Sequence, residues 1–582
     1  MQIKNLSIHF TGSQGTTPAL QDICINVNKG ETVAIVGESG SGKSVTALSI
    51  LQLLPTPPAV YTSGEILFND GNKTVNLLQY SLNQMEAIRG NRIAMIFQEP
   101  MTSLNPVVTC GQQVAEALVL HKKLTRSAAK QAAVELFEQV KLPAPASLFK
   151  RYPHQLSGGQ KQRVMIAMAM SCKPELLICD EPTTALDVTV QKSILQLIKT
   201  LQQQNNMGVI FISHDLGVVA EIADRIVVMY KGQIVEQGSV EQIIKTPQHL
   251  YSKALLACGP ALHTKGERLP VVSDFLNRDE EPGTALEAPG TSLRKPGAVT
   301  AKNKDSRIGL QRTEFEANND TVLQVSNLAV FYPIKKTFLG KTTAWTKAVN
   351  NVSLNVKQGE TLGLVGESGC GKTTLGRAVL GLLKPTAGNV IFKGIDIAAA
   401  SHQTWKALRK DMQIIFQDPY SSLNPRKTIG SAIAEPLLVH KLYRTGKQRK
   451  EKVMELLHKT GLQAEHYNRY PHEFSGGQRQ RIVIARALAL QPSFIVCDES
   501  VSALDVSVQA QVLNLLNDLK KEFGFTAIFI SHDLSVIRYM SDRIAVMNNG
   551  TIEETGITEE VYNNPQSIYT KRLIASMPAI FE

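Results

Sequence analysis

The sequence predicts an α/β protein that consists of two copies of one domain in tandem. The same motifs occur twice along the 582 residues, in the same order. Several of them follow short apolar runs that are typical of buried parallel strands. The length agrees, because one domain takes roughly 100–200 residues. A repeat this long indicates duplicated domains and not a solenoid, whose repeats run roughly 20–50 residues.

The composition is that of a globular protein. Hydrophobic residues make up 43% and charged residues 19% of the chain, which argues against a wholly disordered or collagen-like protein. No apolar run reaches the roughly 18 residues of a membrane-spanning helix, and the first ten residues lack the features of a signal peptide. The seven cysteines are scattered and form no C-x-x-C pair. We therefore expect reduced thiols, without a disulfide framework or a zinc site.

Each copy is predicted to have a parallel-sheet core with a helical insert. Buried strands are expected within 31–40, 175–182 and 208–215 of the first copy, and within 360–369, 493–500 and 526–533 of the second. Between 98–157, and again between 417–475, the apolar spacing becomes helical. The expected layout is therefore a sheet core interrupted by helices in both copies.

The stretch between the copies differs from both of them. It has five Pro and five Gly and no sustained apolar period, which is typical of a linker with little core of its own. We expect a first domain at 1–259, a linker at 260–320 and a second domain at 321–582. The linker holds nine Lys+Arg and ten Asp+Glu, so the net charge of +11 lies on the two domains. Such a surplus indicates an acidic partner: nucleic acid, anionic lipid or nucleotide phosphate.

A glycine-rich loop with a lysine follows the first strand of each copy. GESGSGKS (37–44) returns as GESGCGKT (366–373). Glycines let the backbone wrap closely, so that N–H groups face phosphate oxygens, and the following helix presents its N-terminus to the same anions. Lys43 and Lys372 would reach the β- and γ-phosphates, and the hydroxyls of Ser44 and Thr373 would bind Mg²⁺. One such match could arise by chance, but two matches, each after an apolar strand, argue strongly against a chance glycine-rich turn.

An Asp-Glu pair ends a later strand in both copies. Asp180 and Asp498 follow four apolar residues and are expected on the Mg²⁺ side. Because a strand alternates its side chains, Glu181 and Glu499 can face an attacking water instead. SGGQ (157–160 and 475–478) precedes a helix and is expected to form a second anion site through its exposed N–H groups.

Both halves contain, in the same order, a lysine loop, a glutamine, SGGQ, an Asp-Glu strand, an ALD loop (185–187 and 503–505) and a histidine. This ordered set resembles the ATP-binding cassette (ABC) family over both halves of the chain. The resemblance implies two tandem P-loop cassettes, each a RecA-like parallel-sheet core with an antiparallel β subdomain and a helical insert. It also implies that the cassettes pack head to tail, so that each ATP lies between one lysine loop and the opposite SGGQ.

The resemblance assigns roles to matching positions in both halves. Asp187 and Asp505 match the loop that links the two sites. Phe10 and Tyr332 match an aromatic ring that stacks on adenine, although strand core is the plainer interpretation. The expected catalytic residues are Glu181, His214, Gln98, Glu499, His532 and Gln417. The expected metal ligands are Ser44, Gln98, Asp180, Thr373, Gln417 and Asp498. The expected ATP-binding residues are Phe10, Gly37, Ser39, Gly40, Ser41, Gly42, Lys43, Ser44, Ser157, Gly158, Gly159, Gln160, Tyr332, Gly366, Ser368, Gly369, Cys370, Gly371, Lys372, Thr373, Ser475, Gly476, Gly477 and Gln478.

Three further segments resemble the peptide and nickel importer branch of this family. They are F-Q-[ED]-P-x-x-S-L-N-P at 97–106 and 416–425, R-Y-P-H at 151–154 and 469–472, and the tails 246–257 and 564–578. The tails match imperfectly, since Leu250 follows His249 and Ser567 replaces a histidine. The plainer interpretation of each tail is an amphipathic terminal helix.

The branch implies an ATP-hydrolysing subunit on the cytoplasmic face of the inner membrane, with two separate permeases and an extracytoplasmic binding protein. Because neither half lacks a site residue, we expect both sites to hydrolyse ATP. Some branch members carry a cysteine cluster after the first cassette, but only Cys258 lies there, so no iron–sulfur cluster is predicted. The alternative is a soluble twin-cassette ATPase on the ribosome, which typically has a long charged helical linker. The solute stays open: peptide, glutathione, an opine or nickel.

Overall fold

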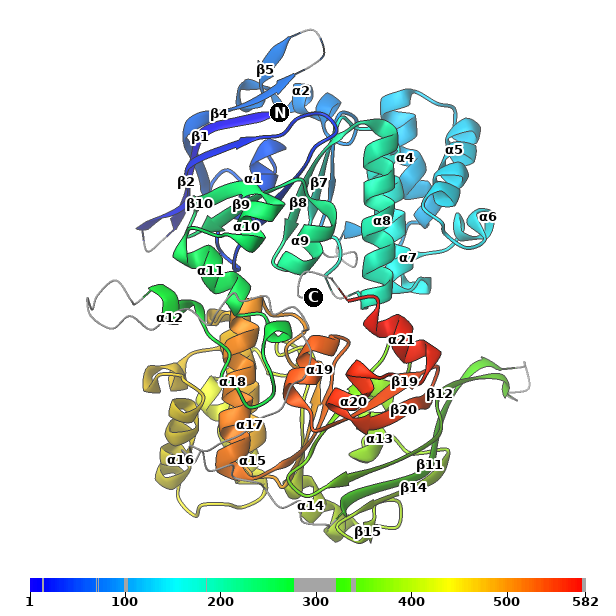
Figure 1. The fold of residues 1–582 in the computed structure, drawn as a ribbon, viewed down its shortest axis with the longest axis vertical. Coiled ribbons are helices and arrows are strands. Elements are labelled where there is room, and N and C mark those ends of the chain that lie inside the picture. The colour runs from blue at the N-terminus through cyan, green and yellow to red at the C-terminus, as the bar shows by residue number, and fades with distance from the viewer. Residues whose placement is uncertain are drawn as a thin grey trace, which may run out of the picture.

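A computed structural model describes residues 1–12, 15–69, 71, 73–98, 103–184, 186–276, 321–336 and 342–577. Figure 1 shows two domains stacked along the long axis, the N-terminal one in blue to green and the C-terminal one in yellow-green to red. Among the described helices, none is both long and apolar enough to cross a membrane.

Each domain contains a six-stranded core sheet. In the first domain the strand order is β10-β9-β3-β8-β7-β6. Every pair is parallel except β10 with β9. All residues of β3 and β7 are buried, because both faces of the parallel sheet are covered, one by helices and the other by α1 (Lys43–Ile50) and an antiparallel sheet. The strands are β3 (Thr32–Val36), β6 (Ile93–Ile96), β7 (Leu176–Asp180), β8 (Gly208–Ser213), β9 (Arg225–Tyr230) and β10 (Gln233–Ser239).

A separate antiparallel sheet, in the order β2-β1-β4-β5, lies beside this core. It places the carbonyl of Ala19 close to Gly42 of the lysine loop, so it forms one wall of the region around that loop. Its strands are β1 (Gln2–Gly12), β2 (Gly15–Asn26), β4 (Ala59–Asn69) and β5 (Thr74–Asn76).

The helical insert leaves the core sheet after β6 and returns before β7. Three helix starts in the insert, at Thr109, Thr125 and Ser157, are capped by a hydroxyl that accepts a backbone N–H, which satisfies donors the helix leaves free. The predicted helical patterns are confirmed as α4 (Cys110–Lys122), α5 (Arg126–Gln139), α6 (Pro145–Leu148) and α7 (Gly158–Met170). The remaining helices are α1 (Lys43–Ile50), α2 (Leu82–Ile88), α8 (Val188–Asn205), α9 (Leu216–Ile222), α10 (Val240–Lys245) and α11 (Leu250–Ala257).

The second domain repeats this plan, with sheets β16-β17-β18-β13-β19-β20 and β12-β11-β14-β15. Its strands are β11 (Thr321–Lys336), β12 (Thr342–Lys357), β13 (Thr361–Val365), β14 (Ala387–Phe392), β15 (Ile395–Asp396), β16 (Met412–Ile415), β17 (Phe494–Asp498), β18 (Thr526–Ile530), β19 (Arg543–Asn548) and β20 (Thr551–Ile557). Its helices are α13 (Lys372–Val379), α14 (His402–Asp411), α15 (Ile429–Val439), α16 (Gly446–Lys459), α17 (Gly476–Leu488), α18 (Val506–Phe523), α19 (Leu534–Met540), α20 (Thr558–Asn563) and α21 (Ile568–Ile574). The α/β fold class predicted from the repeat is confirmed.

The chain after α11 crosses to the second domain and packs there. Leu269 is 1% exposed, and its backbone pairs in both directions with the Asn514 side chain on α18, at 3.0 and 2.8 Å. The Tyr539 hydroxyl on α19 donates to the Glu267 carbonyl at 2.7 Å. Figure 1 shows this green segment, which ends in α12 (Val272–Leu276), beside the orange α18. We call residues 264–272 the strap; residues 277–320 of the expected linker lie outside the described residues.

Candidate nucleotide-binding sites

The lysine loops connect β3 to α1 and β13 to α13. Gly42 and Gly371 end the loops with φ of 104° and 107°, which is the left-handed region that favours glycine. A Cβ at Gly42 would lie 2.7 Å from the Leu20 side chain, and one at Gly371 would lie 2.0 Å from the Ala348 carbonyl. Glycine is therefore required for each loop to lie this close to the antiparallel sheet.

Both loop lysines are buried, at 6% and 4% exposure. The Lys43 ammonium donates to the carbonyls of Gly37 and Glu38, both at 2.8 Å, and Lys372 makes the same two bonds in its own loop. Burial lowers the pKa of Lys43, opposed by Asp505 of the second domain and by Glu181. The loop thus curls around a cation at the end of a buried strand, an arrangement that can receive phosphate oxygens.

Two of the three predicted Mg²⁺ ligands meet in each site, whereas the third, Gln98 or Gln417, donates to the neighbouring glutamate. The Ser44 hydroxyl donates to Asp180 at 3.1 Å, and the Thr373 hydroxyl donates to Asp498 at 2.8 Å. Burial raises the pKa of both aspartates, although the hydroxyl bonds oppose it. Oxygen donors with a buried carboxylate fit Mg²⁺, which takes one or two carboxylates beside substrate phosphates and neutralises their charge when bound.

The two glutamates after these aspartates turn sharply away from their strands. Glu181 and Glu499 have φ of 47° and 46°, a conformation that is uncommon for residues other than glycine and concentrates at functional sites. Each backbone N–H still bonds the neighbouring strand, at Ile212 and Ile530, both at 3.0 Å. The Asp and Glu side chains are thereby directed to different partners, as expected from the sequence.

The glutamine and histidine of each half lie beside its glutamate. Gln98 donates to Glu181 at 3.0 Å, and Nδ1 of His214 lies 3.3 Å from the other carboxylate oxygen. Burial would raise the pKa of Glu181, but His214 and Thr184 outweigh it and lower that pKa to about 2. Burial lowers the pKa of His214, yet the Glu181 carboxylate outweighs it and raises it. The carboxylate is therefore ionised and paired.

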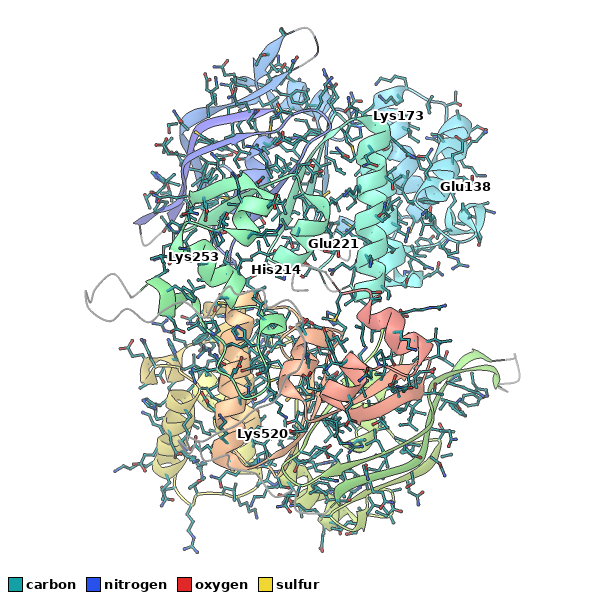
Figure 2. The ribbon with its side chains drawn as sticks, in the orientation of Figure 1. Glu138, Lys173, His214, Glu221, Lys253 and Lys520 are labelled. Carbon is teal, nitrogen blue, oxygen red and sulfur yellow. The ribbon has the colours of Figure 1, made fainter. Side chains whose placement is uncertain are left out.

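The second site has the same arrangement with one contact fewer. Gln417 donates to Glu499 at 2.6 Å, and Nδ1 of His532 lies 3.6 Å from it. The Thr184 hydroxyl donates to the Glu181 carboxylate at 2.9 Å, whereas Ser502 donates to the backbone carbonyl of Glu499 at 3.0 Å. Figure 2 shows His214 on the side of the first domain that is turned toward the second domain.

SGGQ opens α7 and α17. Each serine hydroxyl accepts the backbone N–H of its glutamine, at 3.4 and 3.3 Å. The glutamine side-chain oxygen accepts the serine backbone N–H in return. A Cβ at Gly159 would lie 2.7 Å from Val190 at the start of α8, and one at Gly477 would lie 2.3 Å from Val508 at the start of α18. The second SGGQ glycine therefore fits against the helix that follows the ALD loop of the same domain.

The start of α18 touches the first lysine loop. The Ser39 N–H donates to Asp505 at 2.6 Å, and the Ser507 hydroxyl donates to the Glu38 carboxylate. Val508, the next residue, packs against Gly477. The second SGGQ is thus brought next to the first lysine loop, as a head-to-tail arrangement requires.

The reciprocal contact differs in its details. The Thr189 hydroxyl at the start of α8 donates to Glu367 of the second lysine loop at 2.8 Å. The Asp187 carboxylate accepts from Val190 N–H at 2.9 Å and so caps α8. Of the two predicted linking aspartates, Asp505 hydrogen-bonds the opposite loop and Asp187 caps its own helix.

The two aromatic candidates occupy equivalent register positions. Phe10 pairs with Thr17, two residues before Ala19, and Tyr332 pairs with Thr346, two residues before Ala348. The carbonyls of Ala19 and Ala348 are those that approach Gly42 and Gly371. Tyr332 is 41% exposed, whereas Phe10 is partly packed on the core. Stacking on adenine stays a prediction for both.

Comparison with known proteins agrees with this geometry. Residues 20–184 and 349–502 match the ABC transporter family, and residues 235–280 match the oligopeptide/dipeptide transporter C-terminal region. The chain belongs to the ABC transporter family. It is an ABC-type ATPase with two cassettes.

Similar proteins cover nearly the whole of this twin-cassette chain. The glutathione import ATP-binding protein GsiA of Pectobacterium atrosepticum is 47% identical over 99% of the chain and 89% of that protein. GsiA of Escherichia coli strain K12 is 49% identical with the same coverage. A solved dimeric post-hydrolysis structure of an ATP-binding cassette, bound to ADP and Pi, is 30% identical over 40% of this chain and 98% of its own, with a TM-score of 0.37.

The sequence motifs did not reveal every residue at the cassette interface. Glu38 and Glu367 lie inside the lysine loops, and Ser507 and Thr189 lie two residues after the ALD aspartates. Nothing in their residue types indicates a partner. Their equivalent positions in the two copies are the signal that would have singled them out.

Proposed function

We propose that this ATPase drives the import of glutathione or a similarly short peptide. The observation that carries the proposal is the similarity to glutathione import ATP-binding proteins, at 47–49% identity over 99% of this chain. The match of residues 235–280 to a peptide-transporter C-terminal region supports the same solute class. A peptide solute also agrees with the importer-type segments around both glutamines and before both SGGQ motifs.

We propose that both sites hydrolyse ATP. Glu181 and Glu499 act as general bases toward water, and Gln98, Gln417, His214 and His532 position the reacting groups. Ser44 with Asp180, and Thr373 with Asp498, hold Mg²⁺. In each site the hydroxyl and the aspartate lie within hydrogen-bond distance. This supports the same Mg²⁺-binding role for both pairs. Lys43 and Lys372 neutralise phosphate charge from within their loops.

We propose two permease subunits as partners, docked on the helical inserts at the cytoplasmic face of the inner membrane. Each insert exposes two consecutive apolar side chains near the end of its first helix. Val119 and Leu120 are 39% and 59% exposed, and Leu438 and Val439 are 59% and 58% exposed. Exposed apolar pairs at equivalent positions support a protein-binding surface. An extracytoplasmic binding protein delivers the solute to the permeases.

The test is purification of the tagged chain from detergent-solubilised membranes, followed by solute uptake. Two co-purifying permeases and ATP-dependent uptake of labelled glutathione into vesicles are expected. Leu120→Asp with Leu438→Asp should abolish co-purification and keep nucleotide binding. Recovery of ribosomes without permeases would replace the proposal with the ribosomal twin-cassette alternative. If permeases co-purify but neither glutathione nor short peptides are taken up, the importer assignment stands and the proposed solute class is wrong.

A further inference from the structure

A tyrosine in the last helix of each cassette bonds the lysine loop of the same cassette. The Tyr251 hydroxyl on α11 accepts the backbone N–H of Glu38 at 2.9 Å, and the Tyr569 hydroxyl on α21 accepts that of Glu367 at 3.1 Å. Tyr251 is fully buried and Tyr569 is half-buried. Burial raises the pKa of both phenols, so each stays a neutral hydroxyl. The tail helices thus have a direct contact with the loops that would wrap phosphate.

The tails hold these tyrosines in the same way despite their different sequences. A β10 carboxylate, Glu236, accepts the N–H groups of Gln248 and His249 at 2.7 and 3.1 Å, and His249 Nδ1 accepts the Tyr251 N–H at 3.1 Å. In the second tail Glu554 binds two consecutive N–H groups likewise, and Ser567 replaces the histidine as the cap of Tyr569 N–H at 3.2 Å. The two tails differ in sequence, yet each places its tyrosine hydroxyl at the same position of its own lysine loop.

The same loop residue is also held from the opposite cassette. The main chain of Glu38 bonds Tyr251, while its carboxylate accepts from Ser507. The main chain of Glu367 bonds Tyr569, while its carboxylate accepts from Thr189 at 2.8 Å. The second residue of each lysine loop thus lies between its own tail and the start of the opposite α18 or α8.

We propose that Tyr251 and Tyr569 are positioning residues for ATP, which fix the lysine loop through the N–H of its second residue. That N–H belongs to the peptide unit between Gly37 and Glu38, or between Gly366 and Glu367 in the second loop, so its bond to the phenol holds this peptide unit in one orientation. Without the phenol oxygen, a partly buried donor loses its acceptor, and the loop must be ordered by the nucleotide itself. Loss of the phenol oxygen should therefore weaken ATP binding and leave the rate of the chemical step unchanged.

The test measures ATP affinity at one site at a time. In the full-length chain with Lys372→Ala, titration with a fluorescent N-methylanthraniloyl ATP reports the first site. Tyr251→Phe should raise the Kd about tenfold, the factor that corresponds to roughly 1.4 kcal/mol for one lost hydrogen bond to a buried group. The ring, which packs on Tyr230 with centroids 4.3 Å apart, is retained. Single-turnover hydrolysis at saturating ATP should stay within about twofold.

Tyr230→Phe is the matched control. It removes a hydroxyl from the adjoining ring, and within the described part of the chain that hydroxyl makes no recorded hydrogen bond. If Tyr251→Phe leaves the Kd within twofold of this control, the proposal is wrong, whatever happens to the melting temperature. Tyr569→Phe in a Lys43→Ala chain is the second, independent variant and should raise the Kd of the second site. An unchanged Kd there would refute the proposal even if Tyr251→Phe failed to fold.

Discussion

The strap gives a prediction whose size can be worked from its contacts. Asn514 is 4% exposed on α18 and forms two hydrogen bonds with the backbone of Leu269, at 3.0 and 2.8 Å. Asn514→Ala leaves the buried N–H and carbonyl of Leu269 without these partners. Each unsatisfied group costs roughly 1–3 kcal/mol, so for two groups we expect a loss of about 2–6 kcal/mol in the free energy of unfolding of the second cassette.

Two measurements check this loss. Urea unfolding of the full chain should show the second cassette unfolding at lower urea. Because chains with several domains need not unfold in one step, trypsin cleavage at Lys265 and Arg268 provides the second readout. Both side chains pair with the second cassette, at Asp542 and Asp518, so release of the strap should accelerate cleavage.

Gln196→Ala is the matched control, because Gln196 occupies the equivalent position on α8 and is exposed. Its effect should stay within about 0.5 kcal/mol, the range of ordinary surface substitutions. If Asn514→Ala also stays within that range and leaves cleavage at Lys265 and Arg268 unchanged, the strap does not stabilise the second cassette.

Three further outcomes are expected. Lys43→Ala and Lys372→Ala should each remove one of two bound nucleotides in equilibrium dialysis; retention of both would contradict the lysine assignments. Gly159→Ala should reduce turnover more than Gly158→Ala, because its Cβ would lie 2.7 Å from the stiff Val190 side chain and that of Gly158 lies 3.8 Å from Leu186; equal effects would refute the packing argument. The raised pKa of His214, whose ordinary value is 6.5, makes its pairing with Glu181 fully stabilising below about pH 6.5 and lost as pH rises through the raised pKa. His214→Ala should therefore lower the melting temperature more at pH 6 than at pH 9, and a pH-independent difference would contradict this.

Local sequence predicted the parts that depend on neighbours in the chain. The buried strands β3 and β7, the helices of the insert and the tandem α/β fold follow from apolar spacing and from the repeat. The pairing of Ser44 with Asp180 could be anticipated as well, because parallel strands bring their carboxyl ends to one edge of the sheet.

Contacts between distant segments do not follow from local sequence. Leu269 lies in a Pro- and Gly-containing stretch without apolar period, yet it is buried, because its backbone bonds Asn514 of the other domain. The sequence predicts Tyr251 as part of an amphipathic helix. Periodicity identifies the buried face of a helix but does not identify the hydrogen-bond partner of the tyrosine hydroxyl. Asp187 and Asp505 match the same motif position and bond differently, a difference that the motif alone does not predict.

Phosphate release by variants that lack the general base tests most directly whether both sites hydrolyse ATP. Turnover is measured for the purified complex with no change, with Glu181→Gln, with Glu499→Gln and with both. We predict that each single variant loses at least about half of the turnover and that the double variant loses on the order of 100-fold or more, as removal of a general base requires. Full turnover in either single variant would contradict the claim for that site.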